Sequence, residues 1–288
     1  MKIIESCARC LFDKQKKRSS DPEFLSEIRS LLDNRDENDT APYLVYLFNE
    51  AYKKRFGELK DYKAVKRQYN DLVLSMESGL REKIEAAEDP LSRALLYARI
   101  GNYIDFGAMN DVNEETFMAL FDEAQLSERD RTVVRSFRRQ CRQGKRFLLI
   151  ADNCGEIVLD RLFLEQLRKE FPNLESVVLV RGSDVLNDAT AEDAMYAGID
   201  REAKILSNGN GAAGTVYAML SEEARKVLDE SDVVLSKGQG NYESLCGQGR
   251  HIFYSFLCKC DLFTGRFGVP KLTGIFTEEN ENDQNDRE

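Results

Sequence analysis

A carboxylate and an amide stand together at Asp152 and Asn153, where an apolar run gives way to a helical pattern. The run Arg146–Ile150 reads as a short buried strand, and residues 156–169 carry apolar side chains at helical spacing. Polar residues at the carboxyl end of a strand in an open α/β sheet lie in the crevice where such sheets bind ligands. Carboxylate and amide oxygens are hard donors, so these two residues predict a site for a cation such as Mg²⁺ or Mn²⁺.

Each of the next three predicted strands is also followed by a polar loop. These loops hold Asn187 with Asp188, the small-residue stretch 207–215, and Lys237 with Asn241. The loops at the carboxyl ends of parallel strands converge on one edge of a sheet. Together they would supply carboxylates for a cation, backbone N–H groups at a helix start for an anion, and a lysine for phosphate charge. This set of groups predicts a phosphorylated substrate held against a divalent metal.

The character of the chain changes near residue 143. Residues 20–142 read as helical, and residues 62–84 carry an apolar stripe at spacings of three and four. Short apolar runs then alternate with helical segments, which predicts a mostly parallel sheet covered by helices on both faces. The predicted strands are 147–150, 177–180, 204–206, 233–235 and 252–257, and the helices between the first four are about 156–170, 189–198 and 214–229.

We therefore expect an α-helical domain over residues 1–143 and an α/β domain over 144–276. Residues 277–288 are rich in Glu, Asp and Asn, with no apolar residue after Phe276, which predicts a disordered acidic tail.

Composition narrows the class of function. The formal net charge of −10 argues against nonspecific binding to nucleic acid. No apolar run approaches the roughly 20 residues of a membrane span, and residues 1–10 lack an apolar core of signal-peptide length. We expect a cytoplasmic protein that acts on a small molecule. A single histidine leaves little room for a His-rich metal site or a Ser-His-Asp triad.

The seven cysteines are an odd number in a chain without an export signal, so reduced thiols are expected. Two close pairs occur, and four thiolates brought together would bind a structural Zn²⁺. Buried free thiols are the alternative interpretation. The pairs are Cys7 with Cys10, and Cys258 with Cys260.

Several of these features have plainer interpretations. Gly209, Gly211 and Gly214 form a G-x-G-x-x-G string, but it follows the third strand rather than the first, so a nicotinamide cofactor is disfavoured. Glycine-rich turns are often only tight turns. Lys237 is alternatively a solvated loop residue, and Asp160 and Asp193 alternatively cap a helix or face solvent.

Taken together, these residues resemble the damage-control phosphatases, a metal-dependent family also described as acidic-residue-methyltransferase-like, and within it the smaller prokaryotic-type branch. The resemblance extends from Cys7 to about Val269. The matching positions are the cysteine pair Cys7 and Cys10, residues 101–107 around Asn102, Asp152-Asn153-x-Gly155-Glu156 with Asp160, Asn187-Asp188-Ala189-Thr190 with Asp193, and residues 237–243.

The resemblance implies an α/β fold, a three-layer α/β/α mostly parallel Rossmann-like sheet with an N-terminal all-α domain, and a site between the two parts. It implies hydrolysis of phosphate monoesters of small metabolites, such as sugar phosphates, activated by Mn²⁺, Co²⁺, Ni²⁺ or Mg²⁺. Asp152, Asn153 and Asp188 would be catalytic and bind the metal, with Asp152 either a ligand only or also the nucleophile. The substrate or its phosphate would be held by Asn102, Glu156, Asn187, Ser207, Asn208, Gly209, Lys237 and Asn241.

Two other classes of function stay open. One is a carboxyl methyltransferase that uses S-adenosylmethionine, although methyl transfer gains nothing obvious from acidic residues clustered with a lysine. The other is a noncatalytic protein that binds a sugar phosphate or a nucleotide. Metal-dependent turnover separates the phosphatase from this binding protein, and cofactor binding identifies the methyltransferase.

Overall fold

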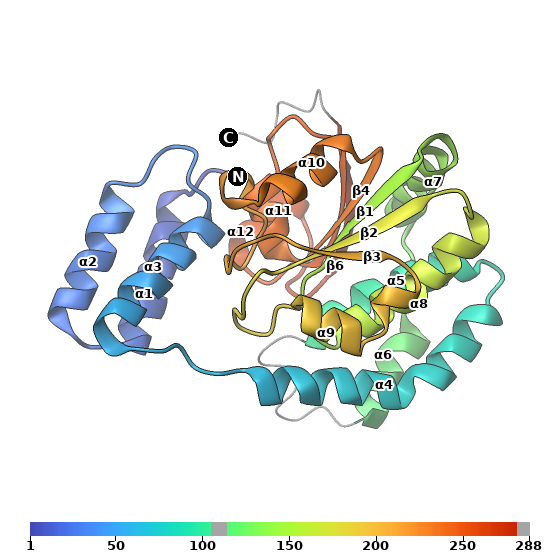
Figure 1. Cartoon of the computed structure of the whole chain (residues 1–288), viewed down its shortest axis with the longest axis horizontal. Helices are drawn as coiled ribbons and strands as arrows, with labels where there is room; N and C mark the ends of the chain where they lie inside the picture. The colour runs from blue at the N-terminus through green and yellow to red at the C-terminus, as the bar shows by residue number, and fades with distance from the viewer. Residues whose placement is uncertain (105–113, 281–288) are drawn as a thin grey trace.

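A six-stranded sheet forms the centre of the molecule, with helices against both of its faces (Figure 1). The computed structural model describes residues 1–104 and 114–280, so Asp105, Phe106 and Gly107 of the helical motif lie outside the described residues. The strands are β1 (Arg146–Ile150), β2 (Glu175–Val180), β3 (Lys204–Ser207), β4 (Val233–Lys237), β5 (Ile252–Leu257) and β6 (Gly274–Glu279).

The helices that precede the sheet are α1 (Glu5–Arg18), α2 (Pro22–Asp33), α3 (Ala41–Phe56), α4 (Lys63–Glu85), α5 (Pro90–Ile100), α6 (Glu114–Glu123) and α7 (Glu128–Gln143). Those that alternate with the strands are α8 (Glu156–Glu170), α9 (Ala191–Tyr196), α10 (Glu222–Glu230), α11 (Gln239–Leu245) and α12 (Asp261–Phe267). Short 3₁₀ helices are η1 (Gly101–Ile104), η2 (Ile199–Arg201) and η3 (Tyr217–Met219).

The strand order is β3-β2-β1-β4-β5-β6, and neighbouring strands are parallel except for the antiparallel pair β5 and β6. The chain moves outward from β1 in one direction and then returns to place β4 on its other side. The carboxyl ends of β1 and β4 therefore flank the point where the strand order reverses, which is where doubly wound sheets bind ligands. The predicted α/β fold with a mostly parallel sheet is confirmed.

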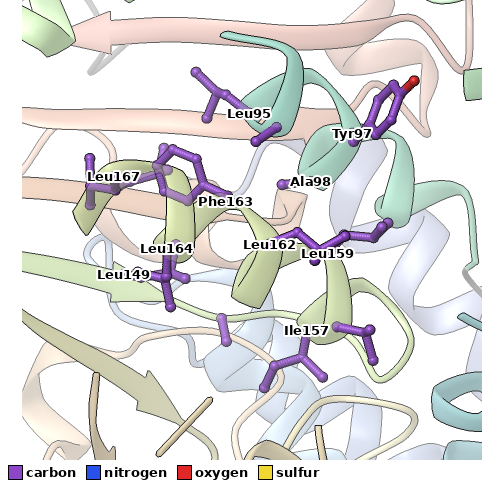
Figure 2. Packing of buried hydrophobic residues seen from close by; sticks show 14 of the residues in the cluster. Leu95, Tyr97, Ala98, Leu149, Ile157, Leu159, Leu162, Phe163, Leu164 and Leu167 are labelled. Atoms are coloured by element: carbon purple, nitrogen blue, oxygen red, sulfur yellow. The ribbon is translucent and has the colours of Figure 1, made fainter. Parts of the chain in front are cut away.

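Successive side chains of β1 point alternately into the two hydrophobic cores, one on each face of the sheet. Phe147 and Leu149 lie in the core that α4, α5, α7 and α8 share, whereas Leu148 and Ile150 lie in the core beneath α10, α11 and α12. Figure 2 shows apolar side chains of α5 and α8 packed against each other beside Leu149. These two cores and the sheet between them are the three layers.

Helix α8 is buried on every side from Glu156 to Leu164. Its charged residues Glu156, Asp160 and Arg161 therefore lie inside the protein, where an unpaired charge is costly and a partner is needed.

Helices α1, α2 and α3 form a separate lobe with a core of its own, built around Phe24, Ile28 and Phe48 (Figure 1). The sequence pattern places a boundary near residue 143, where helices give way to strands. Core membership places the boundary earlier, after α3, because α4, α5 and α7 share their core with the sheet. The helical half thus contributes both a distinct lobe and one of the outer layers.

The prediction that the chain becomes disordered at residue 277 is wrong for residues 277–279. These residues complete β6, whose register pairs Tyr254 with Thr277 and Phe253 with Glu278. Glu279 is buried and accepts hydrogen bonds from the hydroxyl of Tyr254 (3.0 Å) and the backbone N–H of Gly247 (2.7 Å). Acidic composition indicated disorder here because sequence alone does not show that β5 has a free edge to pair with.

The single helix predicted over 214–229 is also wrong. The chain forms η3 and then α10, which begins after Ser221, whose hydroxyl accepts the backbone N–H of Ala224 (3.2 Å). A serine followed by acidic residues is a typical helix start, and it overrides the apolar spacing further upstream. The short helix α9 is capped in the same way by Thr190, with Asp193 completing the capping box.

None of the helices in the described ranges combines the length and the apolar character needed to cross a membrane.

Asp89 fixes the start of α5, the helix that leads into η1. Its carboxylate accepts the backbone N–H of Ser92 (3.1 Å) and two hydrogen bonds from Arg138 of α7 (2.7 and 2.5 Å). The hydrogen bonds from Arg138 lower the pKa of Asp89 to about 2.

We predict that Asp89→Ala lowers the free energy of unfolding by about 0.5–2 kcal/mol through loss of the cap, and that Asp89→Asn, which still caps, loses less. Because the pKa of Asp89 is lower in the folded state than in the unfolded state, its charge stabilises the fold above pH 4 and this contribution fades as the pH falls towards 2. Urea unfolding between pH 7 and 3 measures both effects. Equal losses in the two variants, or an unchanged pH slope in Asp89→Asn, would contradict this role.

Candidate functional site

The residues predicted to bind a cation come together at the carboxyl edge of β1. Asn153 and Asp188 form an isolated antiparallel bridge, although 35 positions separate them in the chain. The backbone N–H of Ala189 donates to the carbonyl oxygen of Asp152 (2.8 Å). Backbone pairing between the two loops thus sets Asp152, Asn153 and Asp188 beside one another.

Gly238, directly after β4, lies against the Asp152 carboxylate. Its φ is +83°, in the left-handed region, and a Cβ built on it would lie 2.1 Å from the Asp152 carboxylate. Any other residue here would displace the carboxylate, so this glycine is a steric requirement of the site.

The Asp152 carboxylate is held by two amides. Its Oδ2 accepts hydrogen bonds from Asn102 Nδ2 (2.9 Å) and Asn153 Nδ2 (2.7 Å). The same two amide nitrogens also donate to Glu156 Oε2, at 2.8 Å from Asn102 and 3.1 Å from Asn153. Asn102 thus reaches from η1 into the sheet edge, as the family resemblance implied.

Negative charge is crowded around Asp152. Burial, together with repulsion from Asp188 and Glu156, raises its pKa to about 8, against the opposing charges of Lys259 and Arg181. Carboxylates packed so closely favour either a proton or a cation.

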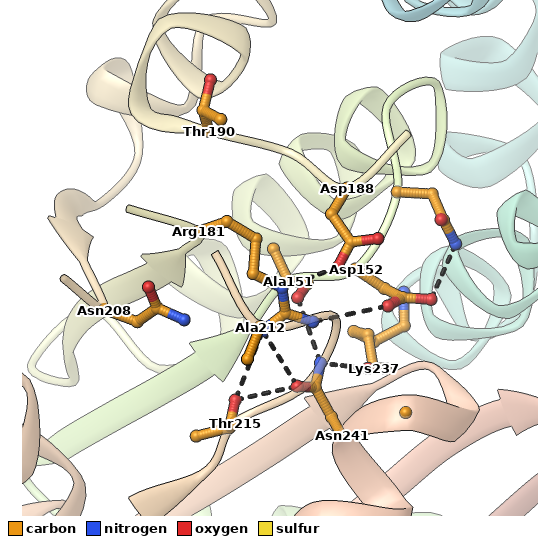
Figure 3. Close-up of polar contacts among 12 residues, drawn as sticks. Ala151, Asp152, Arg181, Asp188, Thr190, Asn208, Ala212, Thr215, Lys237 and Asn241 are labelled. Atoms are coloured by element: carbon orange, nitrogen blue, oxygen red, sulfur yellow. Dashed lines mark hydrogen bonds and ion pairs between the residues drawn. The ribbon is translucent and has the colours of Figure 1, made fainter. Parts of the chain in front are cut away.

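Arg181, which the sequence analysis did not single out, bridges the two candidate metal-binding carboxylates (Figure 3). Its Nε donates to Asp188 Oδ2 (2.6 Å), and its Nη2 lies 3.7 Å from Asp152 Oδ1. On the other side, its Nη1 donates to Asn241 Oδ1 (3.1 Å). The only sequence signal was an arginine directly after β2, which by itself has many roles.

Lys237 is fully buried, so both sequence-based interpretations of it, a solvated residue and a lysine free to bind phosphate, disagree with the structure. Its ammonium contacts Asp160 Oδ1 (2.6 Å), Glu156 Oε1 (2.7 Å) and the carbonyl oxygen of Ala98 (3.1 Å). Those three contacts use its three N–H donors. The charges of Asp160 and Glu156 outweigh burial and raise the pKa of Lys237. Lys237 therefore compensates the negative charges of Glu156 and Asp160 on the buried part of α8.

Asp160 does not face solvent, contrary to one interpretation of the sequence. Burial raises its pKa to about 7, although Lys237 acts in the opposite direction. Asp193, in contrast, does cap α9, and it also contacts Lys66 of α4 (2.6 Å).

The polar side chains of the loop after β3 make hydrogen bonds within this loop and to the loop after β2. The Oδ1 of Asn208 accepts the backbone N–H groups of Gly182 (2.8 Å) and Asn210 (2.9 Å), and Ser207 Oγ accepts that of Gly209 (3.1 Å). The next α-helix begins only after Ser221, so the loop does not present the N-terminus of an α-helix to an anion. A phosphate-binding role for Ser207, Asn208 and Gly209 stays a prediction without support from these contacts.

Asn187 and Asn241 are buried beside the carboxylates. The Asn187 carbonyl accepts the N–H of Cys154 (2.8 Å), which joins the loops after β1 and β2. Asn241 Nδ2 donates to the carbonyl oxygens of Lys237 (2.7 Å) and Ala151 (3.2 Å), which joins the loops after β4 and β1. Both residues therefore act on the geometry of the loops.

The residues at this edge fit a divalent cation. Asp152 and Asp188 supply carboxylate oxygens, and the amide nitrogen of Asn153 is committed to Asp152 and Glu156. The amide oxygen of Asn153 would then be the atom that acts as a ligand. Two carboxylates and an amide oxygen are a hard donor set suited to Mg²⁺ or Mn²⁺.

A cleft of about 950 Å³ separates the α1–α3 lobe from the carboxyl edge of the sheet. One wall includes Tyr52 from α3, and the other includes residues 184–186 and Gln239, which precede Asn187 and Asn241 in the chain. Asp152 and Asp188 are not among its lining residues in the described chain, so the cleft lies next to the carboxylates rather than around them.

The four-cysteine zinc site is not formed. Cys7, Cys10 and Cys260 line the cleft, but Cys258 packs into the core beneath α12. Across residues 1–104 and 114–280, no three His, Cys, Asp or Glu side chains are grouped to hold a metal. Cys258 and Cys260 both follow the end of β5 at Leu257, and Cys258 is buried whereas Cys260 is half-buried at the edge of the same core. All seven cysteines are free thiols.

The family model described as the damage-control phosphatase ARMT1-like domain matches residues 2–273. A relative from Archaeoglobus fulgidus, named "Damage-control phosphatase", is 28% identical and the match covers 93% of this chain and 96% of the relative. Protein MJ0202 of Methanocaldococcus jannaschii is 32% identical, with 76% of this chain and 73% of the relative covered.

The fold is similar to that of a DUF89 family protein, PH1575 of Pyrococcus horikoshii, whose crystal structure matches with a TM-score of 0.75. The match covers 96% of this chain and 99% of that chain at 23% identity, so it speaks for the fold alone.

The Lys237 network makes a testable contribution to stability. We expect Lys237→Met to lower the free energy of unfolding by about 3–5 kcal/mol, because it leaves Glu156 and Asp160 buried without a cation. The control is Lys169→Met, which removes a solvent-exposed pair with Glu85 and should leave the free energy of unfolding nearly unchanged. Chemical denaturation measures both. Losses of equal size would show that the buried network contributes no more than a surface ion pair.

Proposed function

We propose a function for this chain from the family to which it belongs, the damage-control phosphatase ARMT1-like family. In this proposal the protein is a metal-dependent phosphatase that hydrolyses phosphate monoesters of small metabolites. The family match spans residues 2–273, and two of the relatives that it resembles, from Archaeoglobus fulgidus and Pyrococcus horikoshii, carry the name damage-control phosphatase.

The observation that carries this proposal is the grouping of Asp152, Asn153 and Asp188 where the strand order of the sheet reverses. Ligands bind outside the carboxyl ends of strands at this point. A hard donor set in that position supports a divalent cation, with Mn²⁺, Co²⁺, Ni²⁺ and Mg²⁺ as the candidates.

A bound divalent cation would supply Lewis-acid polarisation of the phosphoryl oxygens and a position for the attacking group. This chain's own residues orient its ligands. Asn102 fixes the Asp152 carboxylate, and Gly238 leaves the space that this carboxylate occupies. Asn153 is held by the carboxylates on either side of it. Burial of the site excludes water, which strengthens each electrostatic interaction.

We propose that the organic part of the substrate lies in the adjacent cleft, with the phosphate directed to the carboxylates. The cleft has the volume of a typical small-molecule site. Its walls mix Tyr52, Tyr62 and Val45 with the cations Lys14 and Lys60, which suits a polar metabolite such as a sugar phosphate. We further propose a small phosphorylated metabolite as the binding partner and the cytoplasm as the place of the reaction.

The first prediction from this proposal concerns turnover. Wild-type protein should release phosphate from p-nitrophenyl phosphate and sugar phosphates only with Mn²⁺, Co²⁺, Ni²⁺ or Mg²⁺ present. Asp152→Asn and Asp188→Asn should each lower the rate at least about a hundredfold, equivalent to about 2.7 kcal/mol of barrier. Asp200→Asn, an exposed acid on η2, is the control and should keep the wild-type rate.

Absence of phosphate release with every metal, from folded protein, would contradict the phosphatase. Binding of a sugar phosphate without turnover would then identify a binding protein, and binding of S-adenosylmethionine would identify a methyltransferase.

A second prediction concerns the order of binding. The connected network at the site holds four carboxylates, from Asp152, Asp188, Glu156 and Asp160, against the two cations Lys237 and Arg181. Ionisation of all four would leave an excess of negative charge, which repels a phosphate dianion until a divalent cation offsets it.

Inorganic phosphate should therefore stabilise the protein only when Mn²⁺ is present. At a hundredfold excess over Kd the expected gain is about 2.7 kcal/mol in the free energy of unfolding. Thermal melts with phosphate, Mn²⁺, both or neither measure this, with sulfate as the anion control. Equal stabilisation by phosphate without metal would show that anion binding does not depend on the cation.

A further inference from the structure

Arg181 lies at the carboxyl end of β2 with only 2% of its surface exposed. Its backbone is fixed as well as its side chain. The N–H of Arg181 donates to the carbonyl oxygen of Ala189 (2.9 Å), and Arg181 forms a parallel bridge with Thr190. The base of this side chain is therefore set by the loop that carries Asp188.

The guanidinium is oriented from the opposite side by Asn241 and Thr215 (Figure 3). The amide nitrogen of Asn241 is used by two carbonyl oxygens, so its Oδ1 is directed to Arg181 Nη1 (3.1 Å). Thr215 donates its hydroxyl to the same Oδ1 (2.8 Å), which fixes the amide further. Side chains from the loop after β3 and from helix α11 thus determine where the guanidinium points.

The guanidinium points at the two candidate metal ligands, Asp152 and Asp188. Nε makes a short hydrogen bond to Asp188 Oδ2 (2.6 Å). Nη2 faces Asp152 Oδ1 at 3.7 Å and has no partner at hydrogen-bond distance among the described residues. One planar group therefore spans both carboxylates, with a strong contact to one and a charge contact to the other.

We propose that Arg181 is the positioning residue of the metal site, whose planar guanidinium holds the Asp152 and Asp188 carboxylates in the arrangement that a shared divalent cation requires. The inference rests on the proposed function, since it assumes that these two carboxylates bind the metal. Groups that orient metal ligands commonly change metal affinity by about 10- to 100-fold when they are removed.

The two effects of Arg181 on metal affinity have opposite signs, which makes the proposal testable. A positive charge so close to the site repels a cation, so charge alone predicts that removing it tightens metal binding. Orientation of the carboxylates predicts that removing it weakens binding. Lysine keeps the charge but not the planar, multidentate geometry, so it separates the two effects.

The experiment is a titration of Mn²⁺ into metal-free protein, followed by the electron paramagnetic resonance signal of the free ion, which needs no turnover. We expect Arg181→Lys and Arg181→Gln both to bind Mn²⁺ about 10- to 100-fold more weakly than wild type. Arg161→Gln is the matched control, because Arg161 is also buried and ion-paired but contacts Glu77 and Glu165 on α4 and α8. It should keep the wild-type affinity.

Affinity in Arg181→Gln that equals or exceeds that of wild type would overturn the proposal. Should the Arg181 variants fail to fold, Thr215→Val keeps the test available, since it removes only the hydroxyl that supports Asn241 and Arg181. It should weaken Mn²⁺ binding in the same direction, and unchanged affinity would count against the proposal. Wild type that binds none of the four candidate metals would instead refute the proposed function itself, and with it the role of Arg181.

Discussion

The structure depends on how four carboxylates are kept together inside a protein. Asp152, Asp188, Glu156 and Asp160 are all buried or nearly so at one edge of the sheet. Charges in such surroundings are costly unless they are paired and hydrogen-bonded. Lys237 at the end of β4 and Arg181 directly after β2 supply two positive charges from the strands on either side of β1. A divalent cation would stabilise the ionised form of the carboxyl groups whose pKa burial raises, and this makes the edge suited to such a cation.

The surrounding fold serves that arrangement. Helix α8 is buried on every side from Glu156 to Leu164, so it carries Glu156 and Asp160 into the interior, and β4 places Lys237 where both can reach it. The parallel sheet brings the ends of β1, β2 and β4 to one edge, and Asn241 joins the loops there. The helical half contributes Asn102 to the site and the far wall of the cleft.

Sequence patterns predicted much of this scaffold because strand-to-helix transitions leave local signals. The apolar run before Asp152 and the helical spacing after it were enough to place this residue at a sheet edge. The contribution of β6 was not predictable, because Thr277 to Glu279 become a strand only by pairing with β5. The start of α10 was visible at Ser221, but apolar spacing upstream obscured it.

The roles of the two cations could not be predicted from sequence. Lys237 follows a strand and precedes a glycine, a pattern typical of a phosphate-binding loop, yet its partners lie on α8, 77 or more positions away in the chain. Arg181 shows no local signal, because its role depends on Asp188, Asn241 and Thr215 meeting in space.

The most direct test of the central claim is a crystal structure of the protein soaked in Mn²⁺, with the metal located by its anomalous scattering. The account predicts one strong peak bound by oxygen atoms of Asp152, Asn153 and Asp188. A peak at the cysteines of the cleft, or none at the carboxyl edge of β1 at saturating Mn²⁺, would contradict it.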